Sequence, residues 1–190
     1  MKSLLVVVFV AILLAVAGLI RVDSPAEAAG GGYASRCGGG RIFLYATEER
    51  LLTLHNNARE NHGLKPFCVH PALQRAARAH SKDMIQHDYF SHYTRGRNED
   101  PCTRIRTRIR SFGYGGSYCA ENIGYNAAPE GVFHSWMRSS IHRPNILDGR
   151  FHEICIGACT GHYNDSKTTM YTTDFGAPAE QRSESEQRSE

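Results

Sequence analysis

The segment His134–Leu147, H-S-W-M-R-S-S-I-H-R-P-N-I-L, decides the fold, and the rest of the chain is interpreted around it. It holds the only tryptophan, Trp136. A lone indole typically anchors a core, because one side chain buries a large area at little entropic cost. His142, Arg143 and Asn145 follow it, and polar groups of this kind need hydrogen-bond partners when they are buried. We therefore expect this segment to join a packed helix to a polar feature, with the remaining chain forming a pocket around that feature.

The N-terminal part of the 190-residue chain has the pattern of a secretory signal peptide. Lys2 gives a basic start, the run Leu4–Ile20 is uncharged, and the small-residue sequence Ala26-Glu27-Ala28 follows. This order predicts a signal peptide over residues 1–28 and a secreted, extracellular protein. The uncharged run is long for a signal peptide, so the alternative is an uncleaved N-terminal anchor that holds the domain outside the cell.

We expect one folded domain, residues 45–177, between two segments that cannot bury a core. Residues 29–44 are rich in glycine and are interpreted as a linker. Residues 178–190 are charged, repeat Glu-Gln-Arg-Ser, and are interpreted as a disordered tail.

Six cysteines in an exported chain predict a framework of disulfides. Cys155 and Cys159 are four residues apart in a predicted strand, so their side chains share a face and each is expected to bond elsewhere. Cys37 is expected to attach the glycine-rich segment to the domain. The sequence leaves the pairing open among Cys37, Cys68, Cys102, Cys119, Cys155 and Cys159.

The predicted elements are helices first and a short antiparallel sheet afterwards, which is typical of the α+β class. Periodicity and capping residues predict four helices: one from an N-cap at Thr47 to Gly63, one from Pro71 to about Asp88, one from Pro101 to Gly113, and one that begins at Pro129. Strands are predicted at residues 117–124, 151–160 and 168–175, the last two as a hairpin.

Four arginines flank the apolar stripe of the third predicted helix: Arg104, Arg106, Arg108 and Arg110. We interpret them as a solvated face, because no base-reading motif accompanies them and the chain carries a net charge of only +3. The expected partners therefore exclude nucleic acid and allow a weak attraction to anionic surfaces.

A series of short motifs runs in order from about residue 47 to residue 176. They are His55-Asn56-x-x-Arg59, His62-Gly63-Leu64-x-Pro66, Ala79-His80-Ser81-x-Asp83-Met84, Tyr89-Phe90-Ser91-His92, Glu121-Asn122-Ile123, Trp136-Met137-x-Ser139, His142-Arg143-x-Asn145-Ile146-Leu147, Ile156-Gly157 and Thr173-Asp174-Phe175-Gly176. In this order they resemble the CAP superfamily of SCP-domain proteins, which comprises the cysteine-rich secretory, antigen 5 and pathogenesis-related-1 proteins, in its prokaryotic form.

The resemblance implies a three-layer α-β-α sandwich with a central antiparallel sheet and a surface cleft. In the family this cleft is lined by two histidines and two glutamates, and in some members it holds zinc or another divalent cation. Carried over to this chain, the first three positions are His92, Glu121 and His142. The second glutamate is replaced by Ser139, and the glycine before the second histidine by Ile141.

Two imidazoles and one carboxylate are a common ligand set for a divalent metal, so His92, Glu121 and His142 are the predicted metal site and the candidate catalytic residues. The alternative is a structural network in which the same groups hydrogen-bond one another and the backbone. His55, His80 and Arg143 are expected to be packing or structural residues.

The expected function is that of a non-enzymatic extracellular binding or effector module, with a cleft able to bind a divalent metal. The resemblance implies a lipid (a sterol included), a glycan or a protein as ligand. The alternative is a metal-assisted, peptidase-like hydrolase that uses the His92, Glu121 and His142 side chains. Ser91 and Ser139 are nucleophile candidates by proximity only, because neither lies in a G-x-S-x-G elbow. The sequence leaves the oligomeric state open.

Overall fold

The computed structural model describes residues 30–94, 101–116, 118–126 and 128–178. The helices in these residues are α1 (Ala46–Glu60), α2 (Pro71–Gln86), α3 (Pro101–Ser111), α4 (Pro129–Arg138) and α5 (His142–Leu147). The strands are β1 (Gly31–Ser35), β2 (Arg41–Tyr45), β3 (Cys68–Val69), β4 (Tyr118–Asn126), β5 (Glu153–Tyr163) and β6 (Ser166–Ala177). The predicted signal peptide, residues 1–28, and residues 179–190 of the predicted tail lie outside the described residues.

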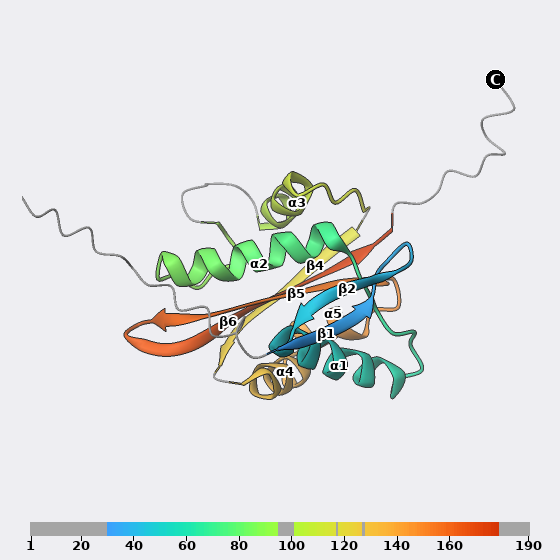
Figure 1. Ribbon diagram of the computed structural model, residues 1–190, viewed down its shortest axis with the longest axis horizontal. Coiled ribbons are helices and arrows are strands. Elements are labelled where there is room, and N and C mark those ends of the chain that lie inside the picture. The colour runs from blue at the N-terminus through green and yellow to red at the C-terminus, as the bar shows by residue number, and fades with distance from the viewer. Residues whose placement is uncertain (1–29, 95–100, 117, 127, 179–190) are drawn as a thin grey trace, which may run out of the picture.

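The central sheet has the strand order β3-β5-β6-β4. β6 pairs antiparallel with both β5 and β4, and only the short β3 adds a parallel pair. Helices α2 and α3 cover one face of this sheet, whereas α1, α4 and α5 cover the other (Figure 1). This arrangement confirms the predicted α+β sandwich of three layers around a mainly antiparallel sheet.

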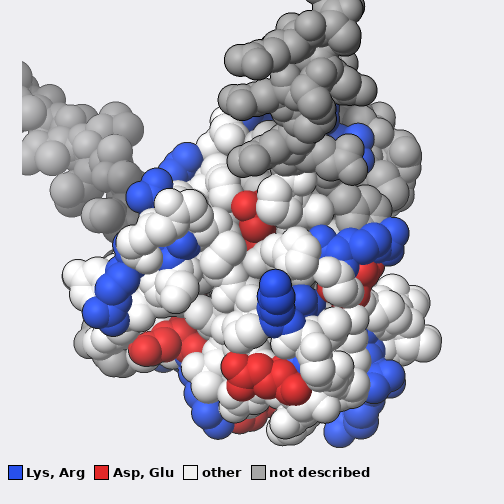
Figure 2. Space-filling model, turned by 90° about the vertical axis from the view of Figure 1, so that its right-hand side faces the viewer, with Lys and Arg blue, Asp and Glu red and all other residues white. Residues whose placement is uncertain are grey.

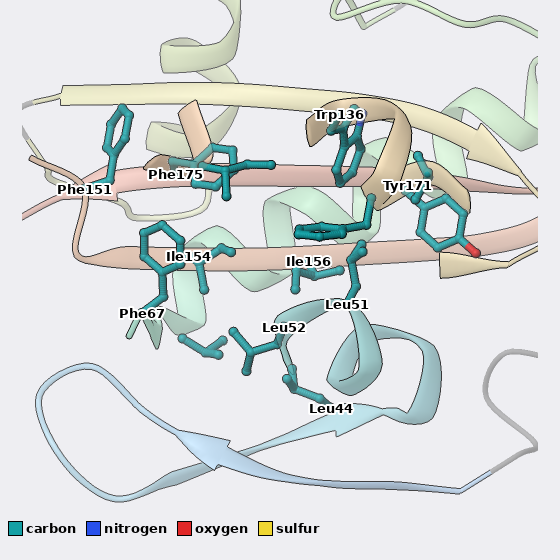
Figure 3. Packing of buried hydrophobic residues seen from close by; sticks show 14 residues of the cluster. Leu44, Leu51, Leu52, Phe67, Trp136, Phe151, Ile154, Ile156, Tyr171 and Phe175 are labelled. Carbon is teal, nitrogen blue, oxygen red and sulfur yellow. The ribbon is translucent and has the colours of Figure 1, made fainter. Parts of the chain in front are cut away.

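The tryptophan segment anchors the larger core cluster, as expected. Trp136 on α4 is 2% exposed and packs with Leu51 of α1 and with Ile156 and Phe175 of the sheet (Figure 3). Its indole Nε1 donates a hydrogen bond to the carbonyl of Ile123 at 2.9 Å, so the polar end of the ring is satisfied inside the core.

Helix α2 packs directly on the backbone of strand β5 at Gly157, which has no side chain to keep it away. A Cβ atom at this position would come within 2.3 Å of the backbone of Ala77. The side chain of Gln74 bonds both the N–H and the carbonyl of Ile156, and Ser81 donates to the carbonyl of Gly157 at 3.0 Å. These bonds fix α2 in register on the sheet and thereby place the segment that follows it.

The glycine-rich segment that was expected to be a linker forms a hairpin instead. Strands β1 and β2 pair antiparallel beside α1, apart from the central sheet (Figure 1). Leu44 of β2 is fully buried and points toward Leu51 and Leu52 (Figure 3). The linker prediction is wrong because the run of four apolar residues 42–45 forms a strand that buries Leu44, in spite of the glycines that precede it.

The cysteine framework agrees with the prediction only in part. Cys37 and Cys68 form a disulfide, which attaches the hairpin to β3 as expected. Cys155 and Cys159 share the face of β5 that packs against α2, which was also expected. Cys155 is nevertheless a buried thiol that donates a hydrogen bond to Asp174 at 3.5 Å, so the predicted disulfide at this position is wrong. The side chain of Cys102 lies outside the described part of the chain.

Several helix boundaries are corrected. Helix α1 begins at Ala46, and its N-cap is Tyr45 in a capping box with Glu48 rather than Thr47. His70 caps α2, since its side chain accepts a hydrogen bond from the N–H of Ala72 at 3.2 Å.

No helix in the described ranges is long and apolar enough to cross a membrane.

A buried arginine joins the first half of the domain to the second. Arg59 is 1% exposed, and its guanidinium lies 3.8 Å from the centre of the Phe67 ring. Its donors reach four carbonyl groups, which belong to Lys65, Ile146, Asp148 and Phe151. Arg143, which was expected to be structural, is instead exposed and contacts His62 at 3.3 Å.

Candidate functional site

A surface cleft of about 630 Å³ opens between the segment after α2, strand β4 and helices α4 and α5. Its apolar lining includes Ile123, Val132 and Trp136, and the exposed aromatic rings of Phe90 and Tyr125 contribute as well. The remaining lining residues are small or polar: Ser91, His92, Tyr93, Gly124, Ser135, Ser139 and His142. The cleft therefore combines apolar walls with a few hydrogen-bonding groups.

The structure brings His92 and Glu121 into direct contact. His92 Nδ1 donates to Glu121 Oε1 at 2.8 Å, and the carboxylate is fully buried while the imidazole is 39% exposed. The segment that carries His92 is fixed to helix α2 by a hydrogen bond, since His80 Nε2 donates to the carbonyl of Ser91 at 3.0 Å. His80 is thus a buried structural histidine, as expected, although it also orients this edge of the cleft.

The second oxygen of Glu121 is occupied by Arg108. The guanidinium Nη2 of Arg108 forms a buried ion pair with Glu121 Oε2, and Nη1 lies 3.3 Å from the carbonyl of His92. The sequence analysis placed Arg108 on a solvated face, and that is wrong: it is 9% exposed, whereas Arg106 and Arg110 are exposed as expected. Arg104's side chain falls outside the described part.

These contacts determine the charge of Glu121. Burial by itself would raise the pKa of this carboxyl group, but the charge of Arg108 and the hydrogen bond from His92 outweigh it and lower the pKa to about 2. Asp174 stands opposite Glu121 on the neighbouring strand, and burial together with the Glu121 charge raises its pKa well above the ordinary value. Of these two acidic groups, Glu121 is therefore the one that holds the charge opposite Arg108, whose guanidinium also lies 3.8 Å from Asp174.

His142 stands at the other side of the cleft. Its Nδ1 lies 2.9 Å from Ser139 Oγ, which also accepts the backbone N–H of His142 at 3.2 Å. Asn122 donates to the carbonyl of His142 at 3.1 Å and accepts from Asn145 at 2.8 Å, so both amides position α5. Burial, followed by the nearby charge of His92, lowers the pKa of His142. Ser139, which stands where the family has a glutamate, acts here as a local hydrogen-bond partner.

These donors fit a metal ion poorly. Both oxygens of Glu121 are already bound, and the buried charge of Arg108 would repel a cation placed beside them. Among the described side chains, no group of three His, Cys, Asp or Glu residues has the arrangement needed to hold a metal. Zinc or another divalent cation at His92, Glu121 and His142 stays a prediction that this arrangement does not favour.

Arg108 and Asp174 are the site residues that sequence reasoning missed. The signal for Arg108 was present, because it lies three residues after Ile105 and four before Phe112, on the stripe that faces the sheet. Asp174 precedes the buried Phe175 in a strand, where a charged residue is unusual without a partner.

The sequence profile of the cysteine-rich secretory protein family, CAP, matches residues 52–175. The chain belongs to this family. The CAP domain is 36% identical over 115 residues to the uncharacterized Bacillus subtilis protein YkwD, covering 59% of this chain and 42% of YkwD. It is 27% identical over 125 residues to the uncharacterized B. subtilis membrane protein YlbC, covering 63% of this chain and 34% of YlbC. The chain thus spans less than half the length of these relatives.

Solved structures share the fold of this CAP domain. An extracellular SCP-domain protein from Bacillus anthracis superposes with a TM-score of 0.56 at 22% identity, over 73% of this chain and 47% of that protein. An outer surface protein from Borrelia burgdorferi gives 0.56 at 15% identity, over 68% and 90% of the two chains. A cysteine-rich secretory protein from Staphylococcus aureus gives 0.51 at 22% identity, over 71% and 40%. At these identities the likeness shows the fold alone.

Proposed function

We propose that this CAP protein is a secreted, extracellular binding module whose cleft receives an organic ligand and performs no catalysis. The observation that carries this proposal is the chemistry of the cleft. Its volume of about 630 Å³ lies within the roughly 300–1,000 Å³ that is usual for small-molecule sites. Most of its lining surface is apolar, and serine and histidine side chains add polar groups. A lipid or a glycan that offers an apolar face and hydroxyl groups matches this lining.

The alternative, a metal-assisted hydrolase, has weaker support. Its carboxylate would have to be Glu121, which is locked between Arg108 and His92. Ser139 lies beside His142, but its hydroxyl oxygen already accepts two backbone N–H groups, from Ile141 and His142. A serine that closes a local turn in this way is poorly placed to attack a substrate.

We expect this protein to bind its partner in a small-ligand site and not on a charged face that attracts polyanions. On the face seen in Figure 2, basic and acidic side chains are interspersed over a largely uncharged surface. Such a face produces no extended field of one sign, which is the usual footprint of a nucleic-acid site.

The proposal can be tested with an environment-sensitive apolar dye, anilinonaphthalene sulfonate, and a matched pair of variants. Ser135 lines the cleft, so Ser135→Phe should fill it and abolish saturable dye binding. Ser140 is exposed and does not line the cleft, so Ser140→Phe should bind the dye like the unmodified protein. Equal binding by both variants would show that the dye does not enter the cleft, and the proposal would fail.

The hydrolase alternative has its own test, which is a zinc titration by calorimetry of the unmodified protein and of His142→Ala. Saturable binding at equal molar ratio that disappears in the variant would restore the metal site and make hydrolase assays necessary. Heat of dilution alone, with both proteins folded, would leave the binding module as the better description.

A further inference from the structure

The hydrogen bonds around the two cleft histidines assign a different tautomer to each. Glu121 is a carboxylate and can only accept, so the 2.8 Å contact places a proton on His92 Nδ1. Because Arg108 already neutralises Glu121, the site needs no second proton on this ring. The Nε2 atom of His92 is therefore a hydrogen-bond acceptor.

The bonds of Ser139 determine the tautomer of His142. Ser139 Oγ has two lone pairs, and it accepts the backbone N–H groups of Ile141 at 3.3 Å and of His142 at 3.2 Å. Its hydroxyl proton is left for His142 Nδ1, which lies 2.9 Å away. With Nδ1 as an acceptor, the ring proton of His142 is on Nε2, and this atom is a donor.

Both Nε2 atoms are available to a ligand. The two histidines line the cleft, and neither Nε2 atom is buried or has a hydrogen-bond partner among the described residues. Two serines of the cleft also keep hydrogen-bonding capacity. Ser91 accepts the N–H of Tyr93 at 3.1 Å and keeps its proton, whereas Ser135 donates to the carbonyl of Gly131 at 3.0 Å and keeps its lone pairs. These four side chains thus offer two donors and two acceptors.

A half-exposed aromatic ring lines the same cleft. Tyr125 is 50% exposed, and the rings of Phe90 and Tyr163 support it at centre-to-centre distances of 5.1 Å and 5.3 Å. A ring that its neighbours already fix loses little entropy when a ligand stacks on it. The described lining residues include no lysine, arginine, aspartate or glutamate. The cleft therefore suits an uncharged ligand that has an apolar face and several polar groups.

We propose that the cleft binds an uncharged sugar of gluco configuration, with one sugar ring stacked on Tyr125. This inference rests on the binding module proposed above and names the class of its ligand. A hydroxyl group both donates and accepts, so the sugar hydroxyls can donate to His92 Nε2 and accept from the Nε2–H group of His142. A gluco ring carries its hydroxyl groups around its edge and exposes C–H groups on its faces, which an aromatic ring can cover.

The same groups disfavour an acyl chain or an extended peptide. An acyl chain would cover the two Nε2 atoms without a hydrogen bond, and burying polar groups in this way is costly. An extended peptide would pair with the free edge of β4, the last strand of the sheet. At the cleft, however, the carbonyl of Ile123 on this strand is already bound by Trp136 Nε1.

The test is a calorimetric titration of the full chain with cellotriose and with chitotriose, two uncharged β-1,4-linked sugars of this configuration. We expect saturable binding of at least one of them. Tyr125→Leu removes the ring but keeps an apolar wall, so it should weaken sugar binding about tenfold and leave binding of the anilinonaphthalene sulfonate dye intact. Tyr33→Leu is the matched control, because Tyr33 is 60% exposed on β1 and does not line the cleft. Sugar binding that Tyr125→Leu leaves unchanged would overturn the proposal.

The histidine part has a separate readout. Nitrogen-15 NMR of the imidazoles should find the proton of His92 on Nδ1 and that of His142 on Nε2, and the same tautomer in both rings would overturn this part. His142→Phe should weaken sugar binding about two- to tenfold, the usual contribution of one hydrogen bond between neutral groups. His134→Phe, at an exposed position that does not line the cleft, should leave it unchanged.

Failure of this inference differs from failure of the proposed function. If neither sugar binds while the dye still enters the cleft, the sugar proposal is wrong and the binding module stands. If the dye does not enter the cleft either, both are wrong.

Discussion

Protonation of His55 should make the unfolding free energy of this protein fall steeply between pH 6.5 and pH 4. The ring is fully buried against Phe133, Trp136 and Phe175, and Nδ1 donates to the carbonyl of Leu51 at 2.7 Å. Its Nε2 is buried without a hydrogen-bond partner among the described atoms, so no acceptor compensates a second proton. Burial, the dominant cause, lowers the pKa of His55 from 6.5 to about 4.

The sign and size follow from the linkage between proton binding and folding. Because the folded state binds the proton less readily than the unfolded state, the stability that neutral His55 provides is fully present above pH 6.5. It is lost progressively down to about pH 4. One pKa unit corresponds to about 1.4 kcal/mol, so the whole loss amounts to about 3 kcal/mol from this residue.

The assay is urea unfolding of the wild type and of His55→Phe at a series of pH values from 7 to 4. Phenylalanine keeps an aromatic ring in the apolar site and cannot titrate, so the variant should gain about 3 kcal/mol relative to the wild type as the pH falls. His62→Phe is the matched control, since His62 makes the same contact to the carbonyl four residues earlier, at 2.7 Å, in the exposed turn that follows α1. Parallel pH profiles for His55→Phe and the wild type would refute the reasoning.

Four further changes test other parts of the structure. Arg59→Lys should cost about 3 kcal/mol or more in urea unfolding, because one ammonium group cannot reach four carbonyls, whereas the exposed Arg143→Lys should cost less than about 0.5 kcal/mol. Arg108→Met should destabilise the fold by about 3–5 kcal/mol, because the buried Glu121 carboxylate loses its guanidinium and keeps only the bond from His92. Arg108→Met with Glu121→Met should recover most of the loss, and no recovery would contradict the ion-pair account. Gly157→Ala should lower the thermal midpoint by forcing α2 off the sheet, with a cost of about 1–3 kcal/mol, while Ala at the open Gly115 should cost less in the same melt. Replacing Cys37 and Cys68 together by serine should lower the free energy of unfolding by about 2–4 kcal/mol. An unchanged midpoint in guanidinium would show that this disulfide adds nothing to the stability of the fold.

Features of the fold with a local cause were predictable from the sequence. Trp136 predicted a core anchor, and the prolines at the starts of α2 and α4 predicted helix N-termini. The β-branched residues in β5 and β6 predicted a hairpin. The hairpin β1–β2 was missed because the many glycines before it are typical of a linker, although a short apolar run that buries Leu44 follows them. Short β3 was missed because its two residues gain order only by pairing with β5.

The candidate site was predictable by resemblance and only in part by physics. His92 and Glu121 were expected to meet, and they do. The partner of that pair, Arg108, was misplaced although its spacing from Ile105 and Phe112 puts it on the inner stripe, because spacing alone does not decide whether a charged side chain there turns inward or reaches out to solvent. That choice depends on whether a carboxylate lies on the neighbouring strand. Glu121 becomes a neighbour of α3 only in the folded chain.

The guanidinium of Arg59 also constrains the order in which the chain can fold. Three of the carbonyls that it binds lie 87–92 residues later in the chain. Until those residues have been synthesised and have packed, α1 carries a charged group with no place in a core. Contacts of such long sequence separation form late and slow the folding of a domain. The surroundings of the first helix are therefore completed only after α5 and the segment before β5 have packed against it.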